Sequence, residues 1–260
     1  MYSKTLFLLL LTACAGSVPP VAPPIEVPSA EQIAADTAKF AVNAPDRSEA
    51  DRALDAGRQP EELLRWAGIT PGMRVGELMS GGGYTAELLA RAVGPGGQVY
   101  GINSPFILER FAQAPWTARL EKPVNANIVR LDRDFDDPLP DEVRDLDRAL
   151  SILVYHDFVW METDRASMNA DIFASLRPGG LYVVVDHSAE AGSGLRDVQT
   201  LHRIDQPVVR AEIEAAGFEF VSESEFLRNP EDTRDWSASP GAAGERRGTS
   251  DRFAMIFQRP

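Results

Sequence analysis

Three consecutive glycines, residues 81–83, separate a short apolar run from a segment with helical periodicity. The run at residues 75–77 predicts a β-strand, residues 84–93 predict a helix, and residues 98–102 predict a second strand. This order is typical of the opening of a doubly wound α/β sheet, whose ligand lies over the carboxyl ends of the strands. Glycine permits positive φ and a close approach of the backbone to a ligand. The same turn also serves simple helix–strand packing, so it does not establish a ligand site alone.

The remaining periodicity extends the sheet to seven strands. Further strands are predicted in five segments: residues 127–131, 148–155, 181–185, 218–222 and 252–258. Helices are predicted at residues 31–42, in two short pieces within residues 48–67, and at residues 165–176 and 208–216. We therefore predict one doubly wound, Rossmann-like α/β domain over residues 30–260. The long connection at residues 228–249 has no periodicity, which indicates either a functional loop or disorder.

Charge and cysteine content exclude several function classes. The chain of 260 residues has a formal net charge of −13 and no basic run, so we expect no nucleic-acid partner. Cys14 is the single cysteine. The chain can therefore form no internal disulfide, and the part that follows Cys14 contains no thiol nucleophile.

The first fourteen residues have the layout of a secretory signal peptide. Lys4 precedes an apolar core at residues 5–13, which is too short to span a bilayer. Residues 11–14, Leu-Thr-Ala-Cys, resemble the lipobox of bacterial lipoproteins, in which the cysteine is lipidated. Residues 15–29 contain five prolines and predict an extended tether. We therefore expect a cell-envelope lipoprotein that meets the membrane only through a lipid anchor on Cys14.

Two alternatives remain open for this segment. It is compatible with a plain secretory signal in which Cys14 is incidental. A mis-assigned start codon would instead place the protein in the cytoplasm.

Several motifs together resemble the class I S-adenosylmethionine-dependent methyltransferases. The first motif of that family is an acidic residue at the end of a strand, followed by a GxGxG turn. Glu77, Gly81 and Gly83 match this motif, whereas Met79 stands where a glycine is usual. The sequence Arg-Pro-Gly-Gly at residues 177–180 occupies the place of the proline–glycine–glycine turn before the fifth strand.

The resemblance covers about residues 63–260. Three segments, residues 81–85, 155–157 and 201–205, are similar to a bacterial subgroup described only as predicted methyltransferases. The resemblance also implies that the sheet ends in an antiparallel pair. We therefore expect a seven-stranded, mostly parallel sheet with an antiparallel C-terminal strand.

The resemblance implies S-adenosylmethionine as the cofactor, with Glu77, Gly81, Gly83, Asn103 and Asp132 around it. Asn103 ends the second strand, where the family usually has an acid that grips the ribose hydroxyls. An amide lacks the charge-assisted strength of a carboxylate in that role. Asp132 follows the third strand and matches the position that meets the adenine amino group. A solvated surface acid explains Asp132 equally well.

A dinucleotide dehydrogenase is the rival interpretation of the same turn. Gly81, Gly83 and Ala86 satisfy its GxGxxA fingerprint. That fingerprint also needs an acid about twenty residues later to bind the ribose, and Asn103 occupies this place. Glu77 at the end of the first strand favours the methyltransferase pattern.

The chain has three histidines, and two of them follow predicted central strands beside an acid. His156 precedes Asp157, and His187 follows Asp186; His202 lies fifteen residues further on. Methyl transfer to oxygen or nitrogen needs a base, and histidine titrates near neutrality. We predict His156 as the general base, with Asp157 biasing its tautomer or raising its pKa. Hydrogen bonding within the rim of the crevice is the structural alternative.

The same five residues also carry ligand atoms that suit a metal ion. Their spacing matches no metal motif such as HExxH, so no metal site is predicted. The sequence as a whole favours an S-adenosylmethionine-dependent methyltransferase that acts on a small-molecule acceptor. The alternative is a membrane-tethered domain of the same fold that binds a ligand without transferring methyl groups. Because S-adenosylmethionine is made in the cytosol, an envelope location would require its transport.

Overall fold

The computed structural model describes residues 1–2 and 28–260. The predicted signal peptide, Cys14 and almost all of the predicted tether lie outside the described residues. Within the described residues, no helix is both long and apolar enough to cross a membrane.

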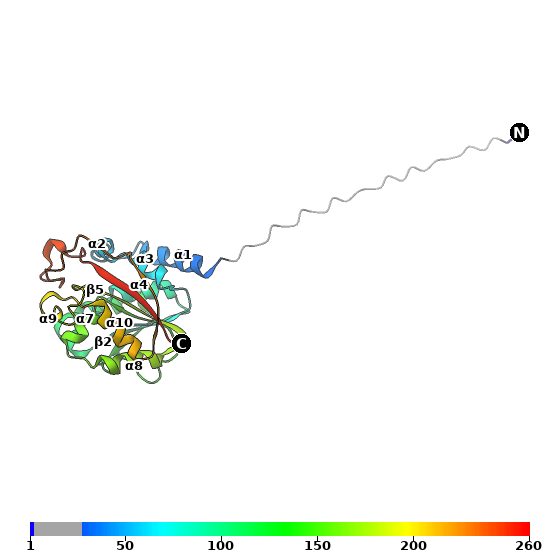
Figure 1. The fold of residues 1–260 in the computed structure, drawn as a ribbon. Helices are drawn as coiled ribbons and strands as arrows, with labels where there is room; N and C mark the ends of the chain where they lie inside the picture. The colour runs from blue at the N-terminus through cyan, green and yellow to red at the C-terminus, as the bar shows by residue number, and fades with distance from the viewer. Residues whose placement is uncertain (3–27) are drawn as a thin grey trace.

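One mixed sheet of seven strands organises the domain, in the order β3-β2-β1-β4-β5-β7-β6 (Figure 1). The strands are β1 Arg74–Leu78, β2 Gln98–Asn103, β3 Ile128–Asp132, β4 Leu146–Ile152, β5 Leu176–His187, β6 Glu219–Ser224 and β7 Arg252–Gln258. Strands β1 to β5 pair in parallel, and β7 runs antiparallel to both β5 and β6. The predicted fold class, including the antiparallel C-terminal strand, is confirmed.

Helices cover both faces of the sheet because its central strands are apolar on both sides. One face carries α1 Ala30–Val42, α3 Pro60–Trp66 and α4 Tyr84–Val93 over a core that includes Leu64 and Leu89. The other carries α6 Gln113–Leu120, α7 Tyr155–Trp160, α8 Arg165–Ser175 and α10 Gln206–Ala215 over a second core. Figure 1 shows these two layers with the sheet between them. Along β4, Ala149 faces the second core and Leu150 the first, as alternation in a strand requires.

The fourth strand ends earlier than predicted. It stops at Ile152, and residues 155–160 form α7 instead of continuing the strand. Leu153 takes a left-handed conformation with φ of 61°, which turns the chain away from the sheet. The apolar run of the sequence hid this turn, because helix and strand both bury such residues. As a result, His156 lies at the start of a helix above the sheet edge.

Candidate functional site

A cavity of about 930 Å³ opens at the carboxyl ends of β1, β4 and β5. The glycine turn before α4 and the end of α2 Glu49–Arg58 form one side of it. The start of α7 and parts of the loop at residues 238–248 form the other side. Its volume is at the upper end of ordinary ligand pockets. Of the residues predicted from the sequence, Glu77, Gly81, His156 and Asp157 line this cavity.

The glycines of the turn have different surroundings. Gly81 has φ of 54°, and a Cβ built on it would meet no atom within 4 Å. Gly83 has φ of 82°, but a Cβ there would lie 2.5 Å from the ring of Trp116 on α6. Gly81 therefore presents open backbone to the cavity. Gly83 packs under Trp116 and is not among the residues that line the cavity, although the adjacent Gly82 and Tyr84 are.

Asn103 hydrogen-bonds to the glycine turn and is not among the residues that line the cavity. Its side chain is fully buried. The Oδ1 atom accepts a hydrogen bond from the Gly81 N–H at 2.8 Å, and Nδ2 donates to the Gly81 carbonyl oxygen at 3.2 Å. A carboxylate could accept the first bond but could not donate the second. This pairing gives a physical reason for asparagine where the family usually has an acid.

Asp132 lies away from the cavity. It pairs with Asn103 across β2 and β3, but its side chain is 42% exposed. Its carboxylate accepts an ion-paired hydrogen bond from Arg130 at 2.7 Å. The structure therefore matches the solvated-acid interpretation of Asp132, and places neither Asp132 nor the Asn103 amide in the cavity.

Glu77 is a buried carboxyl group with a free oxygen. Burial raises its pKa to about 7, although hydrogen bonds with Ser80 and Thr85 act in the opposite direction. Its Oε2 atom has no hydrogen-bond partner among the described residues. An unpartnered buried polar atom is costly, so this oxygen is suited to a ligand group that donates a hydrogen bond.

His156 lies between two carboxylates. Its Nδ1 atom is 2.7 Å from Oδ1 of Asp186, and its backbone N–H donates to Oδ2 of the same residue at 2.7 Å. Its Nε2 atom is 3.3 Å from Oδ1 of Asp157. Burial lowers the pKa of His156, but the charges of Asp186 and then Asp157 outweigh it and raise the pKa to about 9. The expected pairing with Asp157 is present, and the closer partner is Asp186, which the sequence places beside His187.

The other two histidines converge on His156 from separate loops. The ring centres of His187 and His202 lie 5.6 Å and 5.4 Å from that of His156. His187 shares a hydrogen bond of 2.7 Å between Nδ1 and Ser250 Oγ. Burial, and then the positive groups around it, keep the pKa of His187 well below its ordinary value. His187 is therefore neutral, in contrast to His156.

A metal ion is the alternative occupant of this cluster. Ligand atoms of His156, Asp157 and His202 all lie within 4.8 Å of one another. Around a tetrahedral zinc ion with bonds of about 2.0–2.1 Å, neighbouring ligand atoms lie roughly 3.4 Å apart. Asp157 Oδ1 already lies 3.3 Å from His156 Nε2 and 3.6 Å from His202 Nδ1, so these two separations fit, but His156 would have to lose its proton. As it stands, the cluster is arranged to hold a proton between carboxylates.

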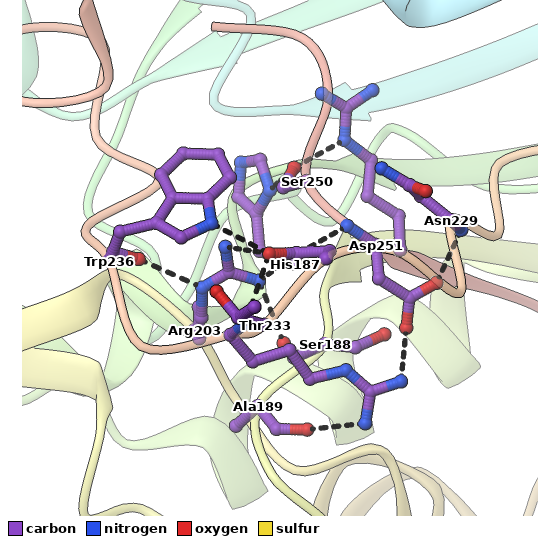
Figure 2. A network of polar contacts seen from close by, with 12 residues as sticks. His187, Ser188, Ala189, Arg203, Asn229, Thr233, Trp236, Ser250 and Asp251 are labelled. Atoms are coloured by element: carbon purple, nitrogen blue, oxygen red, sulfur yellow. Dashed lines mark hydrogen bonds and ion pairs between the residues drawn. The ribbon is translucent and has the colours of Figure 1, made fainter. Parts of the chain in front are cut away.

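A buried polar network fixes the long loop beside this cluster (Figure 2). Arg203 is fully buried and forms an ion pair of 2.7 Å with Asp232, which also accepts a hydrogen bond from the Trp236 indole N–H. Asp251 accepts hydrogen bonds from Arg234 and from the Asn229 backbone N–H. The loop predicted to be either functional or disordered is thus held in place, and it forms one wall of the cavity.

A second hollow of about 820 Å³ lies on the outer side of this network. Its arginines are already engaged, since Arg228 and Arg234 pair with Asp251, and Arg210 pairs with Glu214. It contains none of the histidines. We therefore place the functional site in the first cavity.

No family model matches the sequence. The structure is similar to a SAM-dependent methyltransferase from Aquifex aeolicus, with a TM-score of 0.57, 16% identity, and coverage of 81% of this chain and 97% of that one. It is also similar to the geranyl diphosphate C-methyltransferase from Streptomyces coelicolor, with a TM-score of 0.56, 15% identity and coverage of 85% and 87%. A third similar structure is the [4+2]-cyclase SpnF, with a TM-score of 0.56, 17% identity and coverage of 92% and 99%. At such identities these likenesses show the fold alone, and a fold does not determine a reaction.

Proposed function

We propose that this protein is an S-adenosylmethionine-dependent methyltransferase that acts on a small-molecule acceptor. The main support is that one cavity is lined both by the open backbone of Gly81 and by His156, whose ring contacts the buried Asp186. The first group is suited to binding a ligand closely, and the second to handling its proton. The likeness to methyltransferase folds supports the same proposal.

The residues around the turn fit the amino-acid end of this cofactor. The free Oε2 of Glu77 would accept a hydrogen bond from the ligand's ammonium group, and Gly81 would let the ligand reach the backbone. Asn103 and Gly83 act indirectly, because they shape the turn without lining the cavity. We assign no cofactor contact to Asp132. When bound, the cofactor supplies a methyl group activated on a sulfonium.

We assign the proton transfer of the reaction to His156. His156 accepts the acceptor's proton at Nε2, while Asp186 holds Nδ1 and fixes the orientation of the ring. Because the pKa of His156 is about 9, only a small fraction of the imidazole is neutral at pH 7. Proton acceptance by His156 therefore becomes more frequent as the pH rises toward 9.

A methyl-transfer assay with a panel of small alcohols, phenols, amines and acids tests this proposal. Wild-type protein should transfer labelled methyl to at least one acceptor, and His156→Gln should lose about 10²- to 10⁴-fold of the rate. His202→Gln tests the neighbouring ring, which also lines the cavity and lies 3.6 Å from Asp157: loss of rate in this variant but not in His156→Gln would move the role to His202. Equal rates in wild type and His156→Gln would reject the role of His156. If no acceptor is methylated, the domain is better explained as a ligand-binding module.

We also propose, from the sequence alone, that lipid on Cys14 tethers the domain to the cell envelope. Cys14→Ser should then release the protein from the membrane fraction. Continued sedimentation of this variant with membranes in high salt would contradict a lipid anchor.

A further inference from the structure

Three arginines line the functional cavity without an acidic partner. Arg58 ends α2, Arg247 follows the 3-10 turn Gly244–Arg246, and Arg252 begins β7. All three border the cavity that holds Glu77 and His156. Among the described residues, none of the three guanidinium groups forms an ion pair, although most other arginines of the domain do. Six other arginines of the described chain also lack an ion pair, but none of them lines the cavity.

Arg252 is the most deeply buried of the three, with 3% of its surface exposed. Its Nε donates to Ser250 Oγ at 3.1 Å, and Nη1 donates to the backbone carbonyl of Gly57. Both hydrogen-bond partners are neutral, and the nearby carboxylates of Asp186 and Asp232 favour the cation without forming an ion pair with it. Burial, and then the nearby charge of Arg58, lower the pKa of Arg252 to about 10, which still leaves it cationic at neutral pH.

Arg58 has donors that nothing in the described chain accepts. Its guanidinium carbon lies 4.5 Å from the centre of the Tyr84 ring, and that ring is fixed by a hydrogen bond of 2.7 Å to Asp55. A ring face offsets part of the cost of a buried cation but leaves its N–H groups free. Burial lowers the pKa of Arg58, and the charge of Arg247 acts in the same direction.

Two acids lie near Arg58, and neither pairs with it. Asp51 is occupied by Arg119, with contacts of 2.5 and 2.9 Å. The pKa of Glu77 is about 7, so that carboxyl group is largely neutral below this pH. Arg252 is buried, Arg58 is half-buried and Arg247 is exposed. Charges of one sign without partners are costly where they are buried, and a ligand of opposite charge would stabilise such a site.

We propose that Arg58, Arg247 and Arg252 form a binding site for one small anionic group, a carboxylate or a phosphate, on an organic ligand of the cavity. Guanidinium groups donate paired N–H bonds to such groups. The inference rests on the proposed function in one respect: the ligand is either the methyl acceptor or the cofactor. In the first case the acceptor is an organic acid or phosphate, held in the same cavity as His156. In the second, the site binds the carboxylate at the methionine end of the cofactor.

Binding of inorganic phosphate tests this site without any catalytic turnover. Titration of the whole protein with phosphate should give saturable binding and raise the unfolding temperature. Arg58→Gln and Arg247→Gln should each weaken this binding about tenfold or more. The control Arg65→Gln removes the same charge from the exposed pair with Glu62 on α3 and should leave binding unchanged. Without phosphate, Arg58→Gln should unfold at a higher temperature than wild type, because it relieves repulsion that a merely structural arginine would not cause.

Comparison of S-adenosylmethionine with 5′-methylthioadenosine, which lacks the amino-acid carboxylate, identifies the source of the anion. If Arg58→Gln weakens only the former, the cofactor brings the carboxylate. If both affinities are unchanged while phosphate binding is lost, the acceptor brings it. Absence of saturable phosphate binding to wild type, or equal binding to the Gln variants, would overturn the site. Phosphate binding by a protein that methylates nothing would keep the site and reject the proposed function.

Discussion

The two walls of the cavity are held by different forces. The glycine wall, residues 77–87, follows from contiguous sequence: a buried strand, a turn and a helix, joined by backbone hydrogen bonds and the Asn103 amide. The loop wall, residues 228–251, has almost no regular structure and is held by the buried Arg203–Asp232 pair. The first wall is therefore a local consequence of the fold, whereas the second depends on a few long-range polar contacts.

This difference predicts that a single substitution can destabilise the loop wall locally while the glycine wall stays folded. Asp232→Asn preserves the shape of the side chain but leaves Arg203 buried without a carboxylate. Loss of one partner of a buried ion pair costs about 3–5 kcal/mol of unfolding free energy. Denaturant unfolding should show this loss, and hydrogen exchange should rise in residues 228–251 but not in residues 77–87.

The matched control for this prediction is Asp141→Asn, which breaks the pair between Arg144 and the fully exposed carboxylate of Asp141. It should cost at most about 1 kcal/mol. A similar small cost for Asp232→Asn would show that the loop wall does not depend on its buried pair.

The glycine wall should be most sensitive at Gly83. A valine there must adopt positive φ, which costs about 1–2 kcal/mol, and its Cβ would collide with Trp116. Overpacking adds about 1–3 kcal/mol, so we expect Gly83→Val to lose roughly 2–5 kcal/mol in total. Unchanged thermal unfolding of Gly83→Val would show that the turn tolerates a side chain beside Trp116.

His156, which lines the cavity from α7, should make the stability of the fold depend on pH. Its pKa in the folded protein, about 9, lies above its ordinary value of 6.5. The protonated ring therefore stabilises the fold fully below about pH 6.5, and this contribution is lost as the pH rises through 9. The difference amounts to at most about 3 kcal/mol. Urea unfolding between pH 7 and 9.5 should show the decline in wild type and not in His156→Gln; parallel curves would place the pKa elsewhere.

Of these variants, a substitution of Asn103 should have the smallest effect on stability. Its effect on cofactor binding tests whether this side chain contacts the ligand. Asn103→Asp removes the donor to the Gly81 carbonyl oxygen and places a carboxylate against it, at a cost of about 1–3 kcal/mol. It should not strengthen cofactor binding, although it introduces the acidic residue that is usual at this position in class I methyltransferases. Tighter binding of S-adenosylmethionine without loss of stability would mean that the side chain at position 103 faces the ligand.

The two walls also differ in how far the sequence predicts them. The seven strands, the antiparallel end of the sheet and the glycine turn were predictable because period-2 and period-3.6 patterns and glycine positions are local signals. The convergence of His156, His187 and His202 could be suspected, since the first two follow neighbouring parallel strands. The Asp186 contact to His156 required the early end of β4, which a continuous apolar run does not reveal.

The loop wall could not be predicted. Arg203 and Asp232 are separated by 28 intervening residues, and nothing in the sequence distinguishes Asp232 from its acidic neighbours. Asp205, the nearer candidate partner for Arg203, instead accepts hydrogen bonds from the backbone of Gly192 and Gly194. The three unpaired arginines were also hidden, because an unpaired charge is recognised only once every possible partner has been placed.

Calorimetric titration of S-adenosylmethionine tests the central claim most directly, namely that the open backbone at Gly81 forms the cofactor site. Gly81→Ala and Gly72→Ala both place a Cβ at positive φ with no atom within 4 Å, but only Gly81 lines the cavity. We predict saturable binding to wild type and to Gly72→Ala, and its loss in a folded Gly81→Ala. Equal affinity in all three proteins, or no binding to wild type, would contradict the account.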